Sequence, residues 1–203
     1  MKTDENQTKL AQFDEFFSIK YTFNINASII SKAQLPDYQQ FIANMPMPFK
    51  IASEVNTLEQ SALRPLQAVA GVASQLMEYL NHQSKKMDLL IGYILGQQDD
   101  DNARFEAIKF GGGGIIFQTD DTQLFNTSDF IELKLFFPEE NSALYCVGEI
   151  VDTELVDSIN QHKVIFHHIR EEDREALVRN SLHQQSKQLQ ALAQQRSQEK
   201  KPK

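Results

Sequence analysis

Residues 66–94 read LQAVAGVASQLMEYLNHQSKKMDLLIGYI, and this stretch organises the chain. Its apolar residues follow one another at intervals of three and four, which is the spacing of a supercoiled helix rather than a straight one. The polar Gln83 takes the one vacant place in this series. At about 1.5 Å per residue the helix would be roughly 43 Å long. We call the series the seam, and its members are Leu66, Val69, Ala73, Leu76, Leu80, Gln83, Met87, Leu90 and Ile94.

The positions beside the seam predict how many helices meet there. Tyr79 and Tyr93 lie on one flank and Met77 and Ile91 on the other, so the apolar face is broader than that of a two-stranded coil. Every second member of the seam, beginning with Leu66, is at heptad position a. Leucine and methionine at this position, in place of β-branched residues, also disfavour a parallel dimer. We therefore predict a homo-oligomer, with a tetramer favoured, in which Gln83 sets the register. The alternative is that this face packs on its own chain.

Composition limits the class of protein. The chain has 203 residues, 41% of them hydrophobic, and a net charge of −8, so we expect no binding to nucleic acid or to an anionic membrane. Its single cysteine, Cys146, fits a reducing compartment. No apolar run approaches the ~18 residues of a membrane span, and the first residues lack the apolar core of a signal peptide. These features predict a cytoplasmic protein without membrane insertion.

Outside the long helix, the pattern predicts a small antiparallel β-barrel. Residues 18–30 alternate apolar and polar side chains, as a half-buried strand does. A helical region interrupted by Pro46 and Pro48 follows, and after the long helix come short strands separated by turn signals at the spacing of a barrel. The fold class is therefore α+β. The short strands are expected at 105–110, 115–119, 130–136, 144–151 and 163–168.

The C-terminal part is predicted to be helical from its acidic start at Glu171 to about Arg196, followed by a disordered tail. It carries a second apolar series that either extends the bundle or lies on the barrel, namely Val178, Leu182, Leu189 and Leu192, with Gln185 in the gap. The expected organisation is an N-terminal strand region at 1–36, a helical insertion at 37–97 with the long helix at about 65–96, the barrel at 98–170, and the C-terminal helix and tail at 171–203.

Candidate catalytic and metal-binding residues are few. Asp99–Asp101 lack the spaced ligands, central glycine and final glutamate of a calcium loop, so we interpret them as a solvated turn. Cys146 and a histidine would need a third, orienting group to act as a nucleophile pair, and alternation places His167 and His168 on opposite faces of a strand. We predict no catalytic residue, no metal site and no enzyme. The alternative, an enzyme that uses Cys146 and a histidine, predicts loss of activity on Cys146→Ala.

Four consecutive glycines, Gly111–Gly114, connect two of the predicted strands. Glycine permits positive φ and close approach of a ligand or of another strand. The run lacks the Lys-Ser/Thr of a phosphate-binding loop, and no helix follows it, so binding of a nucleoside triphosphate has little support. A tight, bulged connection at the barrel rim is the simpler interpretation.

Four segments together resemble a PilZ domain, the small barrel that binds cyclic di-GMP in bacteria. The resemblance covers roughly residues 105–182. It implies that residues 18–30 complete the barrel and that the helical region is an insertion, as in PilZ proteins that tetramerise through a parallel coiled coil. The segments are FGGGGIIF (110–117), FIELKLFFPEE (130–140), YCVGEIV (145–151) and HKVIFHHIREEDREALVR (162–179).

The ligand motif of this family, Asp/Asn-x-Ser-x-x-Gly, falls on residues 109–114. Only its final glycine, Gly114, is kept, because Lys109 stands in place of the acidic or amide residue and Gly111 in place of the serine. The family's Arg-x-x-x-Arg arm, which precedes the first strand, has no counterpart, since the first arginine of the chain is Arg64. Lysine lacks the forked donors of a guanidinium, so tight binding of cyclic di-GMP is not expected.

Arg170 and Arg174 have the spacing of that arm but follow the closing strand, so we interpret them as a salt-bridge pattern at a helix start. The resemblance thus implies a noncatalytic, oligomeric regulatory adaptor in cyclic di-GMP-related signalling, for example in motility, pili or surface behaviour, without a cofactor and with an unknown protein partner. The alternative is a genuine cyclic di-GMP receptor with unconventional basic residues. Candidate ligand residues are Arg104, Lys109, Gly111, Gly112, Gly113 and Gly114.

Overall fold

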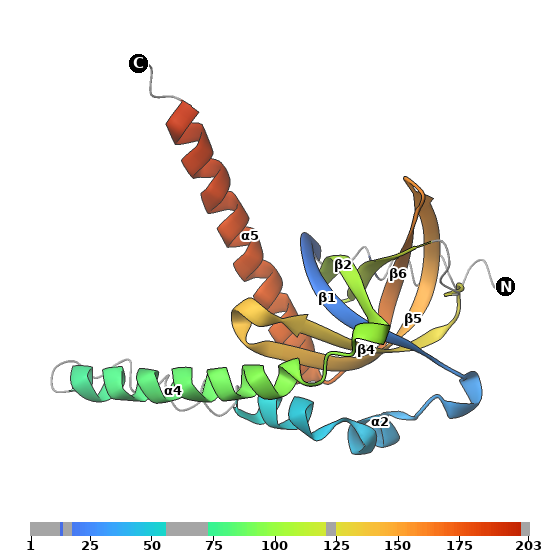
Figure 1. Ribbon diagram of the computed structural model, residues 1–203, viewed down its shortest axis with the longest axis horizontal. Coiled ribbons are helices and arrows are strands. Elements are labelled where there is room, and N and C mark those ends of the chain that lie inside the picture. Colours follow the sequence, from blue (N-terminus) through green and yellow to red (C-terminus); the bar gives the residue numbers. More distant parts are fainter. Residues whose placement is uncertain (1–12, 14–17, 56–72, 121–124, 200–203) are drawn as a thin grey trace.

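The computed structural model describes residue 13 and residues 18–55, 73–120 and 125–199 (Figure 1). Six strands form a closed antiparallel barrel in the order β1-β2-β3-β6-β5-β4. The α+β fold class is confirmed, and β1 closes the barrel between β2 and β4 as expected. The strands are β1 (Ser18–Ile30), β2 (Arg104–Gly111), β3 (Gly114–Thr119), β4 (Phe130–Phe137), β5 (Ser142–Val156) and β6 (Ile159–His168).

The inside of the barrel is filled by the apolar residues of the alternating strands. On β4, Ile131, Leu133 and Leu135 are fully buried, whereas Glu132 and Lys134 between them face outward and are half-buried. Each fully buried apolar side chain stabilises the fold by about 1.5–3 kcal/mol, so alternation fixes which face of each strand turns inward.

The β5–β6 hairpin is longer than predicted. β5 runs to Val156 and β6 begins at Ile159, so the two strands continue beyond the expected ends at 151 and 163. Asp157 and Ser158 turn the chain with φ of 50° and 66°, the left-handed conformation that a two-residue hairpin loop requires. The hairpin forms the tip at the upper right of Figure 1.

A second apolar cluster lies outside the barrel, between its wall and the helical region. α2 (Tyr38–Asn44) begins with a capping box, in which Asp37 accepts from the backbone N–H of Gln40 at 2.8 Å and Gln40 accepts from that of Asp37 at 3.1 Å. Residues 47–55 are also helical. These two helical segments, the C-terminal end of α4, and strands β4 and β5 together form the cluster. Its buried residues are Phe41, Met45, Phe49, Ala52, Ile91, Leu95, Phe136, Ala143, Tyr145 and Val147.

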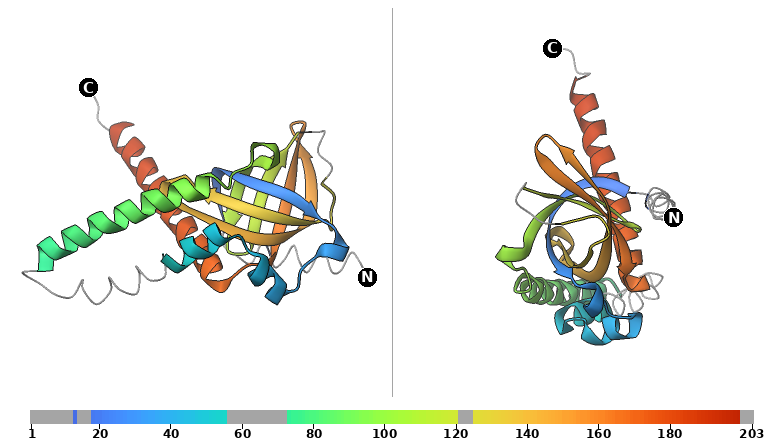
Figure 2. Two further views of the ribbon diagram at one scale, coloured as in Figure 1. Left: turned by 60° about the horizontal axis from the view of Figure 1, so that its bottom comes forward. Right: turned by 90° about the vertical axis from the view of Figure 1, so that its right-hand side faces the viewer.

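α4 (Ala73–Gly96) and α5 (Glu171–Glu199) project from the barrel as separate rods (Figures 1 and 2). The barrel side of α5 is set by Leu177, which is fully buried, and by Ser181 and Gln184. α5 continues to Glu199, past Arg196, so the start of the tail was predicted too early. The described part of the chain also contains the short 3-10 helices η1 (Lys32–Gln34), η2 (Asp101–Ala103) and η3 (Pro138–Glu140).

Within the described ranges, no helix is both long enough and apolar enough to cross a membrane.

Candidate functional site

The glycine run forms the connection between β2 and β3. Gly111 ends β2 and Gly114 begins β3, and the carbonyl of Gly113 accepts from the backbone N–H of Phe166 at 3.1 Å. A Cβ at Gly114 would collide with the carbonyl oxygen of Val164 on β6. The glycine at this position therefore allows two strands to approach closely.

Arg174 lies at this run, although the sequence motif gave no reason to place it there. Its Nη1 donates to the carbonyl oxygen of Gly112 at 2.6 Å. It also has the salt-bridge contact expected from its spacing, with Glu171 at 3.8 Å. This contact could have been expected from the position of Arg174 in the first turn of α5. That turn directly follows β6, which pairs with β3 beside the glycine run.

The side chain of Arg170 is buried and hydrogen-bonded to other parts of the chain. Its Nε and Nη2 donate to the two carboxylate oxygens of Asp173 at 2.7 and 3.0 Å, and Nη2 also donates to the carbonyl oxygen of Phe49 at 3.3 Å. Burial raises the pKa of Asp173, while the hydrogen bonds and charge of Arg170 lower it. Arg170 therefore joins the helical insertion to α5, and its guanidinium is fully used inside the protein.

Arg104 does not lie near the glycine run, so our grouping of Arg104 with Lys109 was wrong. It begins β2, whereas Gly111 ends the same strand, and the intervening residues extend along the barrel. Its guanidinium is paired with Asp99 at 2.8 Å and also with Asp101. The acidic turn thus neutralises Arg104, and in the described residues no group of three or more His, Cys, Asp or Glu side chains could hold a metal ion.

Lys109 belongs instead to a row of lysines on the outer face of the barrel. It is the register partner of Lys20 on β1 and of Ile116 on β3, and Ile116 is in turn the partner of Lys163 on β6. The ring of Phe13 lies beside this row, with its centroid 5.8 Å from Nζ of Lys109 and 5.4 Å from Nζ of Lys163. Motif comparison missed Lys20, Lys163 and Phe13, although the outward position of both lysines follows from strand alternation.

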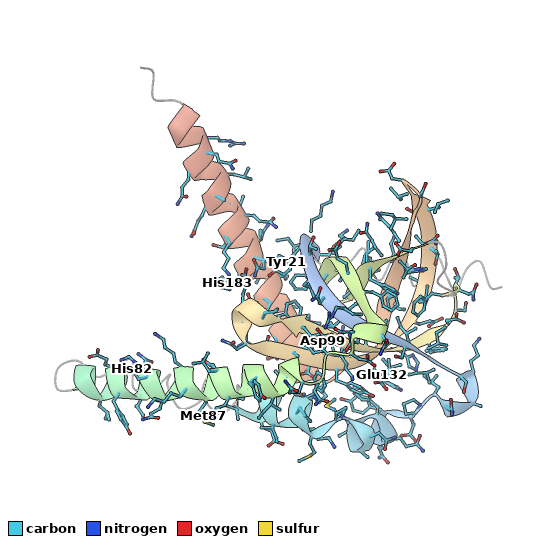
Figure 3. The ribbon with its side chains drawn as sticks, in the orientation of Figure 1. Tyr21, His82, Met87, Asp99, Glu132 and His183 are labelled. Carbon is cyan, nitrogen blue, oxygen red and sulfur yellow. The ribbon has the colours of Figure 1, made fainter. Side chains whose placement is uncertain are left out.

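The second candidate site is the apolar face of α4. Leu76, Met87, Leu90 and Ile94 are 44–61% exposed, and Gln83 between them is half-buried. Among the side chains of α4 that the structure describes, Ile91 and Leu95 in the last turns are buried against the same chain, as the alternative expects, and Leu80 is half-buried. Figure 3 shows Met87 on the part of α4 that extends beyond the barrel. Leu66 and Val69 lie outside the described residues.

The cysteine and the histidines do not form a catalytic constellation. Cys146 is fully buried in the barrel core, and burial raises the pKa of its thiol well above the ordinary value, so the thiolate is disfavoured. His162 is also buried, with Thr119 Oγ1 2.9 Å from its Nε2 and Thr153 Oγ1 2.9 Å from its Nδ1.

The expectation that His167 and His168 face opposite sides was wrong. Their ring centroids are 4.3 Å apart, and His168 donates from Nε2 to the carbonyl oxygen of Pro36 at 2.9 Å. The register shows the cause, because Val147 pairs with His168 but Gly148 pairs with Phe166. This bulge at His167 interrupts the alternation and turns both rings to one side.

Comparison with known proteins bears on the fold alone. No protein-family model matches the chain, and no curated protein matches its sequence. The Bacillus subtilis inhibitor of motility (MotI/DgrA) aligns with a TM-score of 0.40 and 17% sequence identity over 41% of this chain and 42% of that chain, so the match spans less than half of either protein.

A longer match is with a protein from Xanthomonas campestris, described as a tetrameric PilZ domain self-assembled via a helical bundle. It covers 89% of this chain and 96% of that chain, with a TM-score of 0.55 and 12% sequence identity. The resemblance seen in the sequence is therefore confirmed at the level of architecture: the closed barrel and its long helices form a PilZ-like fold.

Proposed function

We propose that this chain is a noncatalytic regulatory adaptor of the PilZ type that acts as a homo-oligomer, with a tetramer favoured. The observation that carries the proposal is the exposure of four apolar seam residues of α4 in the single chain, namely Leu76, Met87, Leu90 and Ile94. The likeness in fold to a protein described as tetrameric through a helical bundle supports it. In this proposal α4 sets the valency, and the barrels present surfaces to a protein partner in cyclic di-GMP-related signalling, in motility, pili or other surface behaviour, in the cytoplasm.

The energetics favour a bundle of several helices. Fully burying one leucine or isoleucine side chain stabilises an interface by about 1.5–3 kcal/mol, whereas association itself costs about 4–15 kcal/mol. Several seam residues from each chain must therefore be buried together. Tyr79 and Tyr93, which are 60% and 70% exposed beside the seam, widen the apolar face beyond what one partner helix covers.

Two neighbouring leucines provide a matched test of this assembly. Leu89 and Leu90 are 68% and 61% exposed, but only Leu90 belongs to the seam. Combining Leu80→Asp with Leu90→Asp should give folded monomers, because each aspartate would place a charge inside the bundle. Leu89→Asp should retain the oligomer. Molar mass from size-exclusion chromatography with light scattering measures both, and an unchanged mass in the double variant would rule out the seam as the interface.

The same proposal includes no tight site for cyclic di-GMP. Arg104 is held by two carboxylates and Arg170 by Asp173, so neither guanidinium is available to a phosphate. Losing one charge-assisted hydrogen bond costs about 1.5–3 kcal/mol, and the loss of several moves a micromolar ligand towards no measurable binding.

A second candidate function, a cyclic di-GMP receptor with unconventional basic residues, is favoured by one observation. Lys109 and Lys163 lie on the outer barrel face, and Arg174 lies at Gly112. Isothermal titration of the folded oligomer with cyclic di-GMP separates the two functions. The adaptor predicts no heat of binding, and the receptor predicts saturable binding in the low micromolar range.

A further inference from the structure

Phe13 is buried against the face of the barrel that carries the glycine run. It is only 2% exposed, although it comes before the first strand. Its Cε2 atom lies 3.0 Å from the position that a Cβ of Gly114 would take. A Cβ at Gly114 would press against this ring, so the glycine at the start of β3 leaves the room that the ring occupies.

Two ammonium groups lie over the ring. The Nζ atoms of Lys109 and Lys163 lie 5.8 and 5.4 Å from its centroid, within the range of cation–π attraction. Among the described residues neither lysine forms an ion pair, and the register partner of Lys163 on the other side, Asp152, makes no salt bridge with it. An aromatic ring satisfies these cations only partly, because it has no formal negative charge.

The space over Gly114 holds a planar ring, and the two ammonium groups close to that ring are cations that can bind a phosphate, so the same space suits a planar base that carries a phosphate. We propose that Phe13 is an intramolecular occupant of a nucleotide site on this face, in which a base would replace the phenyl ring and a phosphate would pair with Lys109 and Lys163. The inference deepens the receptor function described above and rests on it, but it does not depend on assembly through α4. A nucleotide cannot bind while Phe13 occupies the site. The apparent affinity is therefore reduced in proportion to the fraction of molecules in which the site is open.

The first test removes the occupant. Phe13→Ala should bind cyclic di-GMP at least tenfold more tightly than the unmodified protein, a change of about 1.4 kcal/mol, as measured by isothermal titration. Guanosine, which lacks the phosphate, and inorganic phosphate, which lacks the base, should each bind much more weakly. Adding Lys163→Gln to Phe13→Ala should remove the gain. A folded Phe13→Ala protein that binds no better than the unmodified one would overturn the proposal, as would a gain that survives Lys163→Gln.

The second test keeps the site occupied, so that it does not depend on a cavity-forming variant. The chain has no tryptophan, so Phe13→Trp introduces a single fluorescent reporter at the site. Cyclic di-GMP should shift its emission to longer wavelength as the indole is displaced into water, and inorganic phosphate should not. Emission that stays unchanged even at nucleotide concentrations far above those that saturate Phe13→Ala would contradict displacement. Light scattering on the same samples keeps this result separate from the test of the seam.

Discussion

At the scale of single residues, two glycines show how the surroundings decide the role of a residue. Gly114 lies where a Cβ would collide with the carbonyl of Val164, whereas a Cβ at Gly96, the last residue of α4, would have nothing within 4 Å. The same substitution therefore has opposite consequences at the two positions.

Gly114→Ala should lower the free energy of unfolding by about 1–3 kcal/mol, because β3 and β6 must move apart to admit the methyl group. Gly96→Ala is the matched control and should be neutral or stabilise by up to about 1 kcal/mol, since alanine is favoured over glycine in a helix. Urea unfolding followed by circular dichroism measures both. Equal effects of the two substitutions would contradict the close approach at Gly114.

His162 makes the stability of the barrel dependent on pH. Burial lowers the pKa of its imidazole, so the folded protein holds this ring neutral while the unfolded chain takes up a proton near pH 6.5. Its contribution to stability is therefore present above about pH 6.5 and is lost as the pH falls towards the folded pKa, at up to about 1.4 kcal/mol per pH unit. Urea unfolding at pH 7.5, 6.5 and 5.5 should show this fall.

Two variants separate the titration of His162 from its packing. His162→Gln should lower stability at pH 7.5 but flatten the fall between pH 6.5 and 5.5, because it removes the titrating group. Thr153→Val removes one of its hydrogen-bond partners and should lower the whole curve without flattening it. A slope that persists in His162→Gln would assign the dependence to other groups.

At the scale of elements, α4 divides into two parts with different roles. Its last turns anchor it, because Ile91 and Leu95 are buried with Phe41 and Phe49 in the cluster outside the barrel. Its projecting part carries the exposed seam. The last turns of α4 are therefore packed on the same chain, while the exposed seam residues of the projecting part remain available to other chains.

Leu95→Ala should cost about 2–5 kcal/mol of stability, because it removes apolar contacts and leaves a cavity between α4 and the barrel wall. The molar mass in light scattering should remain that of the oligomer, since the seam is intact. This is the reverse of the behaviour expected for Leu90→Asp, which should change the mass and have little effect on the stability of the single chain. A dissociated Leu95→Ala protein would mean that anchoring and assembly are not separate.

At the scale of the whole molecule, one ion pair joins three parts of the fold. Arg170 follows β6, pairs with Asp173 in the first turn of α5, and donates to the carbonyl of Phe49 in the helical insertion. Asp173 is only 1% exposed. The pair therefore holds the insertion and α5 in a fixed relation to the barrel.

Arg170→Met should cost about 3–5 kcal/mol, because it leaves the carboxylate of Asp173 buried without its partner. Adding Asp173→Asn to Arg170→Met should restore part of this loss, since the amide that replaces the carboxylate carries no charge. A double-mutant cycle from urea unfolding measures the coupling. Additive effects of the two substitutions would show that the pair does not act as a unit.

The sequence by itself determined the elements of this protein. Alternation along 130–136 identified β4 with its inward-facing leucines, and intervals of three and four identified α4 and the seam, because strands and helices have side-chain periods that depend only on neighbouring residues. The resemblance to a PilZ domain came from four sequence segments, at 110–117, 130–140, 145–151 and 162–179. The glycine run was correctly placed between two strands, at β2 and β3.

Only the tertiary structure decided which side chains meet. Arg104 and Lys109 are close in sequence but lie towards opposite ends of β2, while Phe13 and Lys163, far apart in sequence, lie side by side. The bulge that turns His167 and His168 to one side also depends on the partner strand. Such contacts arise from barrel closure and strand register, which no local period encodes, and so the candidate site could be assembled only in three dimensions.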